Sequence, residues 1–165
     1  MIRQATVEDV QQIATLLKEK AELLKERGSR QWSAYLEADL SALVQRDLAA
    51  GRLFVFEQNT ELMGSVALLP SHEWDQRLWD DPEGLYIHRL VVRDAAKGRG
   101  VGKQLLRHVL AVATAEEERL RLDCLASNEF LNAYYASFGF TAKGIRDGFS
   151  TYEHEQLAVS DERVI

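Results

Sequence analysis

Cysteine, long apolar runs and an excess of positive charge are scarce or missing in this sequence. The lone cysteine, Cys124, has no partner for an internal disulfide or for a thiolate metal site. It shares one face of a predicted strand with Leu120 and Leu122, opposite Arg121 and Asp123, so the role of a small buried hydrophobe is favoured over that of a nucleophile. No apolar run reaches the ~18 residues of a membrane span. A net charge of −6 disfavours nucleic acid as a partner.

Repeats, low-complexity segments and interdomain linkers are absent as well. A length of 165 residues predicts a single domain over 1–165, large enough to bury an ordinary core. The opening residues run into a charged helix and do not form a signal peptide, and the lone cysteine suits a reducing compartment. We therefore expect a cytoplasmic protein that contacts no membrane. Edge strands near the C-terminus leave a homodimer open.

The stretch 85–107 is the most informative part of the chain. Residues 85–92 are mostly apolar and predict a buried strand. Val101, Leu105 and Val109 recur at helical spacing, so a helix follows. The glycine-rich residues 97–103 lie between the two elements. Glycines let a backbone approach a ligand, and a helix start offers unpaired N–H groups, so this connection predicts an anion site, most plausibly for a phosphate.

Neighbouring charges agree with that prediction. Five cations stand between positions 93 and 107 against one acid: Arg93, Lys97, Arg99, Lys103 and Arg107, with Asp94. A local basic patch on an acidic protein suits a small polyanion such as coenzyme A. The pattern matches neither G-x-G-x-x-G nor the phosphate loop that ends in G-K-[ST]. A glycine-rich turn with solvated charges, or a nucleotide-phosphate binder of another fold, are the alternatives from this loop alone.

Two segments resemble the GNAT family of N-acetyltransferases. Lys97-x-x-Gly100-x-Gly102 is similar to the family's [R/Q]-x-x-G-x-[G/A] acetyl-CoA loop, with Lys in place of the usual Arg or Gln. Residues 90–92 resemble its central strand. The segment 128–140, NEFLNAYYASFGF, resembles the family's "N…A…lYek.GF" segment. Order and spacing of the segments also fit.

The resemblance implies a fold and a cofactor. The fold is an α/β (α+β) GNAT fold: a mixed, mostly antiparallel sheet of about six to seven strands, a splayed central parallel pair and about four helices. The cofactor is acetyl-CoA. Its arm would pair with the backbone of Leu90, Val91 and Val92, and Asn128 would contact it, unless Asn128 is only a helix cap. Its pyrophosphate would be held by residues 97–103, which are Lys97, Gly98, Arg99, Gly100, Val101, Gly102 and Lys103.

The implied reaction is attack of an amine on the thioester, which requires a base and an acid. His88 lies on the central strand where several family members place a glutamate; an ordinary imidazole pKa of about 6.5 suits a base. A core histidine is the alternative. Tyr135, four residues before Gly139, matches the general-acid tyrosine that contacts the cofactor sulfur, and Tyr134 is the second choice. The alternative for Tyr135 is core packing. We expect no metal, because the histidines show no ligand spacing.

The other strands and helices are predicted from local patterns, and two segments between them are candidates for acceptor binding. We expect strands at 2–6, 52–58, 62–69, 119–125, 140–144 and 151–158, with a turn at Asn59–Thr60 between the second and third of them. Helices are expected from 7 to Gly28, at 35–50 with Gly51 as its stop, at 101–117 and between Asn128 and Gly139. Trp32 lies before the second helix, in a region that lines the family's acceptor site. Residues 70–84 form a long acidic loop that carries Trp74 and Trp79, which suits a cationic small molecule. The alternative for all three tryptophans is core packing.

These observations favour an acetyl-CoA-dependent N-acetyltransferase acting on a primary amine of a small molecule, or on a peptide amine. The absence of the usual glutamate keeps a second reading open, a non-catalytic CoA-binding regulator of the same fold.

Overall fold

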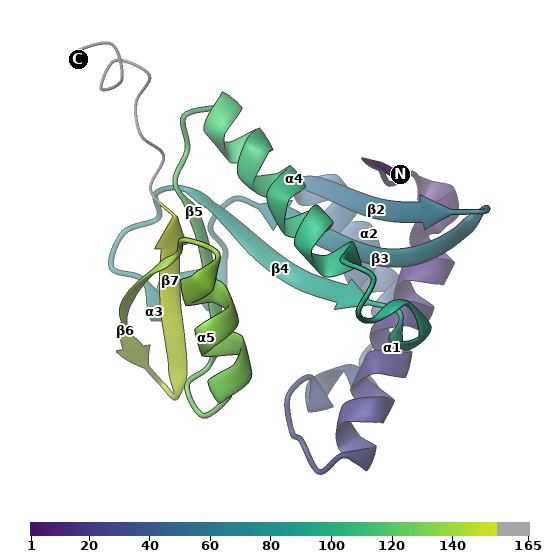
Figure 1. Cartoon of the computed structure of the whole chain (residues 1–165), viewed down its shortest axis with the longest axis horizontal. Helices are drawn as coiled ribbons and strands as arrows, with labels where there is room; N and C mark the ends of the chain where they lie inside the picture. The colour runs from purple at the N-terminus through teal and green to yellow at the C-terminus, as the bar shows by residue number, and fades with distance from the viewer. Residues whose placement is uncertain (155–165) are drawn as a thin grey trace. The chain divides into compact units, whose positions relative to one another are not determined.

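Seven strands form one mixed sheet in the computed structural model, which describes residues 1–154 (Figure 1). The strand order in the sheet is β1-β2-β3-β4-β5-β7-β6. The strands are β1 (Ile2–Gln4), β2 (Arg52–Gln58), β3 (Glu61–Leu69), β4 (Leu85–Val92), β5 (Leu120–Leu125), β6 (Thr141–Arg146) and β7 (Phe149–His154). The pair β4–β5 is parallel, and the registers β1–β2, β2–β3, β5–β7 and β6–β7 are antiparallel. The predicted mixed sheet with a central parallel pair is confirmed.

Five α-helices accompany the sheet within the described residues, where about four were expected. They are α1 (Val10–Glu26), α2 (Leu40–Ala50), α3 (Glu73–Leu78), α4 (Val101–Ala115) and α5 (Glu129–Ser137), with 3₁₀ turns η1 (Val7–Asp9), η2 (Ser33–Leu36) and η3 (Asp94–Ala96). The additional helix, α3, lies in the predicted loop 70–84. It begins where the backbone N–H of His72 donates to the Asp75 carboxylate over 3.0 Å. No helix of residues 1–154 is long and apolar enough to cross a bilayer.

The second helix begins later than predicted. Instead of a helix from position 35, the chain makes the turn η2, and α2 begins at Leu40. Asp39 fixes this start, because its side chain accepts a hydrogen bond from the Ala42 N–H over 3.1 Å. Gly51 ends α2 as predicted, but not through a left-handed conformation, since its φ is −161°. A Cβ there would lie 2.6 Å from the carbonyl oxygen of Leu68, so only glycine fits against β3.

The chain divides into two compact units. The first comprises Met1–Leu69 with His88–His108, and the second comprises Pro70–Ile87 with the described residues from Val109 onward. Strand β4 and helix α4 each run through the boundary. The single domain expected over 1–165 stays a prediction.

The first unit is built on the β2–β3 hairpin. Its turn is Asn59–Thr60, as predicted, and both residues have positive φ, which gives the tight two-residue connection. Alternate side chains of the hairpin point to opposite faces. One face packs on α1 and α2, with Leu53 and Val55 in that core. The other face is covered by α4 (Figure 1). There the ring of Phe54 meets that of His108 of α4, with the centroids 4.6 Å apart.

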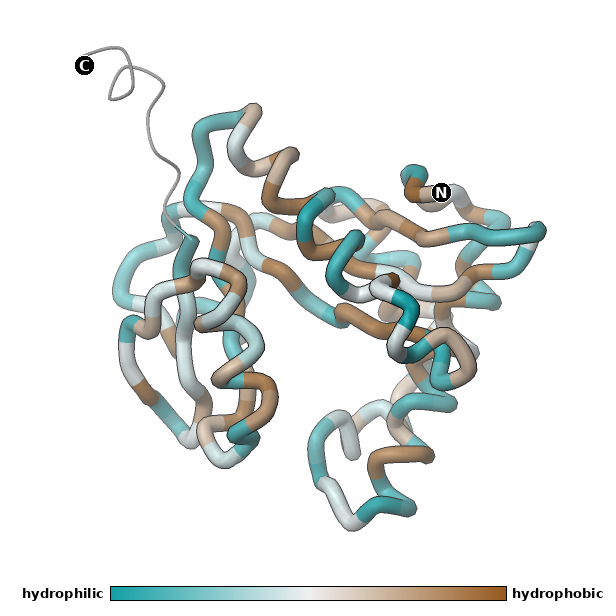
Figure 2. The backbone as a smooth tube through the Cα atoms, viewed as in Figure 1, coloured by the Kyte–Doolittle hydropathy of each residue, from teal (hydrophilic) through white to brown (hydrophobic). Residues whose placement is uncertain are grey.

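The second unit contains a buried network of polar contacts around Arg121, next to its aromatic residues. Arg121 of β5 is 2% exposed, although the alternating pattern placed it on the face opposite the leucines. Its Nε donates to Glu153 over 2.8 Å and its Nη1 donates to the Tyr86 hydroxyl over 2.7 Å. The guanidinium carbon lies 4.2 Å from the ring centroid of Trp79. Hydrophobic residues recur along the strands of the first unit, whereas β7 of the second unit is mainly pale or teal (Figure 2).

The last predicted strands are partly confirmed. β6 and β7 form an antiparallel pair, and Gly148 lies in their turn with φ +84°. The expected strand 151–158 corresponds to β7 up to His154, and its last four positions lie outside the described residues.

Candidate functional site

The connection between β4 and α4 carries the strongest structural signal. After η3 the chain makes turns through 97–100, and α4 begins at Val101. Gly98 and Gly100 have φ values of +82° and +79°, which L-residues rarely adopt. Gly102 serves packing instead, because a Cβ at this position would lie 3.3 Å from a methyl group of Val92.

This connection leaves several backbone N–H groups available. The first bond of α4 runs from the Gln104 N–H to the Gly100 carbonyl oxygen over 3.0 Å. The preceding amides, from Gly100 to Lys103, have no acceptor among residues 1–154, and neither does the amide of Gly98. Such a run of N–H groups at a helix start, with the positive end of the helix dipole, is a site for an anion.

Cations of the first unit gather next to the connection. Lys97 lies 3.4 Å from Asp94, and the guanidinium of Arg27 lies 3.9 Å from the same carboxylate. Burial and the neighbouring ammonium of Lys97 lower the pKa of Lys20 on α1 to about 8. Two cations pair with one carboxylate and a third lies nearby, which leaves a net positive charge that a bound anion would offset.

The central parallel pair is short. The β4–β5 register has only two residue pairs, Leu85 with Leu120 and Tyr86 with Arg121. From Ile87 onward β4 has no partner on β5, although the strand continues to Val92. The left-handed Arg89, with φ +51°, interrupts β4 at this point.

Tyr135 lies on α5, and its side chain is buried among aromatic rings of the second unit. Its ring centroid is 6.1 Å from that of Phe140 and 6.2 Å from that of Tyr152. Burial raises the pKa of the phenol, with smaller contributions from nearby groups. The hydroxyl therefore keeps its proton at neutral pH and can act as a donor.

Two neighbouring predictions concern α5 and β5. Asn128 is the N-cap of α5, because its Oδ1 accepts from the Leu131 N–H over 3.0 Å, so the cap alternative is observed. Cys124 is buried, and burial raises the pKa of its thiol to about 11. A thiol that stays protonated is a poor nucleophile, in agreement with its predicted structural role.

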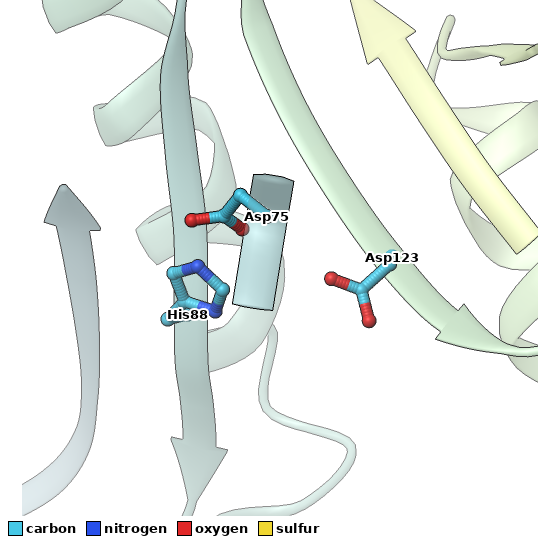
Figure 3. Close-up of side chains that lie close together, drawn as sticks. All are labelled: Asp75, His88 and Asp123. Carbon is cyan, nitrogen blue, oxygen red and sulfur yellow. The ribbon is translucent and has the colours of Figure 1, made fainter. Parts of the chain in front are cut away.

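His88 is half-buried on β4, directly before the left-handed residue. Figure 3 shows its side chain together with those of Asp75, from α3, and Asp123, from β5. Within the second unit Asp75 is buried, and both carboxylate oxygens of Asp123 accept from the Trp74 indole N–H over 3.2 and 3.3 Å. In the sequence, Asp75 is one of several acids in the loop 70–84 and Asp123 is a polar position of an alternating strand. Neither position has a local signal that links it to His88.

The tryptophans differ in what their rings contact. Trp32 has φ +66°, and its ring centroid lies 5.4 Å from that of Tyr35. Trp74 is half-buried against Phe149, with the rings 4.9 Å apart at 89°. Trp79 is 9% exposed and its face is covered by Arg121, so the geometry does not support its predicted acceptor contact.

The acidic residues after α3 are paired with arginines of the chain itself. The pairs are Asp80 with Arg146 at 2.9 Å, Asp81 with Arg121 at 3.0 Å and Glu83 with Arg119 at 3.3 Å. The suggestion that this acidic loop suits a cationic acceptor stays a prediction, and such an acceptor would compete with these arginines. The arginines are distant in the sequence, so the local pattern does not show the pairs.

Comparison with known proteins agrees with this geometry. Residues 12–140 match the acetyltransferase (GNAT) family. The chain is 36% identical over 160 residues to the uncharacterized N-acetyltransferase YesJ of Bacillus subtilis (strain 168), with 93% of this chain and 89% of that protein covered. It is also similar to the crystal structure of a GNAT-family acetyltransferase from Listeria monocytogenes 4b F2365, with a TM-score of 0.78, 31% identity and coverage of 93% and 92%.

The fold recurs in more distant structures. The PaiA N-acetyltransferase of Thermoplasma acidophilum, solved in complex with coenzyme A, has a TM-score of 0.71 at 14% identity, with 94% of this chain and 98% of that chain covered. The match to the family covers most of the chain, and the structure contains the glycine-rich connection and the short parallel pair. This chain belongs to the acetyltransferase (GNAT) family.

Proposed function

We propose that the protein is an acetyl-CoA-dependent N-acetyltransferase that acetylates a primary amine of a small molecule or of a peptide. The observation that carries the proposal is a set of unpaired amides, those of Gly98 and of Gly100 to Lys103, at the start of a helix and beside a cluster of cations. Acetyl-CoA has a diphosphate for these amides. Family membership gives the reaction class, and the acceptor is the proposed part.

The residues of the connection and of β4 bind the cofactor in this proposal. The amides and cations of residues 97–103 hold the diphosphate, with Lys97 and Lys103 as point charges. Leu90, Val91 and Val92 offer backbone groups to the extended arm, since β4 lacks a partner on β5 from Ile87 onward. When bound, acetyl-CoA supplies a thioester carbonyl that an amine can attack. Asn128 contacts the arm from the start of α5.

The leaving sulfur requires a donor, and Tyr135 has that role. Its raised pKa means that the phenol is protonated when the thioester breaks. It also means that complete proton transfer to a thiolate is unfavourable, since an ordinary thiol has a pKa of about 8.5. Tyr135 therefore acts mainly as a hydrogen-bond donor to the developing negative charge. A backbone N–H of β4 stabilises the carbonyl oxygen in the same way.

The attacking amine must first lose a proton. We assign this step to His88, because it lies on the central strand and histidine is the commonest acid–base group in catalysis. Asp75 and Asp123 are the alternative acceptors, each through a water molecule. The His88→Ala and Asp123→Asn variants separate them: loss of the acidic limb of the pH–rate profile identifies His88, whereas an unchanged limb in His88→Ala excludes it.

Aromatic faces are proposed for acceptor recognition. Trp32 and Trp74 are half-buried. The guanidinium of Arg77 lies 5.3 Å from the Trp74 ring centroid, so a cationic acceptor would replace this arginine on that face of the ring. We therefore favour a cationic amine of small size. A cytoplasmic location and a homodimer stay predictions.

Release of the free thiol from acetyl-CoA, measured with a panel of polyamines, aminosugars, amino acids and peptides, tests the proposal. Turnover of at least one amine, with acetylated product identified by mass spectrometry, is the expected result. Tight binding of acetyl-CoA without turnover of any amine would instead support the non-catalytic regulator. No binding at millimolar acetyl-CoA would refute both.

A further inference from the structure

Arg89 has an unusual backbone conformation for its position. Six residues other than glycine have positive φ among residues 1–154. Asn59, Thr60 and Asp147 lie in hairpin turns, and Glu117 follows the end of α4. Arg89 differs from all of them because it lies inside a strand, with φ +51°. A side chain with a Cβ is strained in this region, so neighbouring contacts must hold it there.

The contact that holds Arg89 is a buried bidentate ion pair within the first unit. Its Nε and Nη2 donate to the two carboxylate oxygens of Asp47 on α2, each over 2.5 Å. The side chains are 16% and 6% exposed. Two parallel N–H···O bonds fix the plane of the guanidinium, and burial protects them from water and salt. A lysine would supply the charge but not this geometry.

A third contact extends the pair to the segment that contains Trp32. The Nη1 of Arg89 lies 3.5 Å from the hydroxyl of Tyr35, and the Tyr35 ring packs on Trp32. Trp32 is itself left-handed, with φ +66°. Arg89 and Trp32, which lies in the turn closed by the Ser33 N–H to Arg30 carbonyl bond, are therefore connected through one guanidinium and one phenol.

The bend at Arg89 determines how the following residues are presented. In an unbroken strand the side chains would alternate through Leu90. Here His88, Arg89 and Leu90 are all half-buried in succession, and alternation resumes only with the buried Val91. A left-handed residue inside a strand turns the backbone that follows it, which here is the backbone from Leu90 onward.

We propose that Arg89 is a positioning residue for acetyl transfer, whose ion pair with Asp47 holds the left-handed bend that aims the backbone of Leu90–Val92. The contact with Tyr35 places the Trp32 segment relative to the same bend. This inference rests on the proposed function, in which that backbone binds the cofactor arm. Arg89 does not touch the reacting atoms.

The test compares glycine with alanine at position 89. Both variants are made with Asp47→Asn, so that no unpaired carboxylate stays buried in either. Glycine adopts a positive φ without strain, whereas alanine does not. If the pair acts by holding the bend, Arg89→Gly/Asp47→Asn keeps a kcat at least 10-fold above that of Arg89→Ala/Asp47→Asn. Equal kcat values for the two variants would overturn the inference.

A control and a structural readout separate this role from mere stability. The Arg3–Asp9 pair, with bonds of 2.8 and 2.9 Å in the same unit, supplies the control Arg3→Ala/Asp9→Asn. We expect this control to lower the melting temperature and to leave kcat unchanged. Crystal structures of both position-89 variants show the backbone directly. A left-handed residue 89 in the glycine variant alone supports the inference, and a left-handed alanine overturns it even if the wild-type protein acetylates no tested amine.

Discussion

The substitution Tyr135→Phe removes one hydroxyl and keeps the ring that packs against Phe140 and Tyr152. If the phenol donates to the leaving sulfur, the lost interaction is a hydrogen bond to a charged group, worth about 1.5–3 kcal/mol. That corresponds to a decrease of about 10- to 160-fold in kcat. The Kd for acetyl-CoA should change little, because the interaction strengthens only as the sulfur becomes negative.

Steady-state kinetics and calorimetric titration with acetyl-CoA measure the two quantities separately. Tyr134→Phe is the matched control, since it removes a hydroxyl one position earlier on α5. Burial raises the pKa of Tyr135, so its ionisation should cause no loss of rate between pH 7 and about 10. An unchanged kcat, or an equal loss in both variants, would refute the assigned role.

Three further changes test other parts of the structure. Gly100→Ala, at φ +79°, should weaken acetyl-CoA binding about 10-fold because the left-handed residue no longer presents its amide, whereas Gly148→Ala, at φ +84° in a distant turn, should leave Kd unchanged in calorimetry. The pKa of Lys20 is lowered to about 8 in the folded state, so unfolding takes up protons between pH 8 and 10.4 and stability should rise over that range; Lys20→Met should reduce this rise in urea denaturation. Arg121→Met leaves the buried Glu153 carboxylate without its hydrogen-bonded partner, with only Lys143 at 3.8 Å, and should cost about 3–5 kcal/mol of unfolding free energy. Arg119→Met, in an exposed pair, should cost less than about 1 kcal/mol by the same measurement, and equal costs would contradict the assigned burial.

Local patterns predicted the elements whose causes are local. The strand 52–58, the turn Asn59–Thr60 and the strand 85–92 agree with the structure because hydrophobic runs and turn residues act over a few positions. The glycine-rich connection was found for the same reason. Its alternating glycines and cations are adjacent in the sequence and directly precede a helix, so an anion site with free amides could be predicted there.

Features that depend on distant partners were missed. The bend at Arg89 requires Asp47, more than forty positions away, and nothing near position 89 contains a turn signal. The burial of Arg121 requires Glu153 and Tyr86, which only the strand pairing brings together. Helix α3 has only six residues, most of them polar, which is too short for the apolar periodicity that identifies longer helices.

The amide resonances of residues 97–103 give the most direct test of the central claim that this connection binds the diphosphate of acetyl-CoA. In a titration followed by ¹⁵N–¹H spectra, the amides of Gly98, Gly100 and Gly102 should shift at the lowest cofactor concentrations, and the amide of Gly148 should not. Unchanged positions for these three glycines at saturating acetyl-CoA would contradict the account.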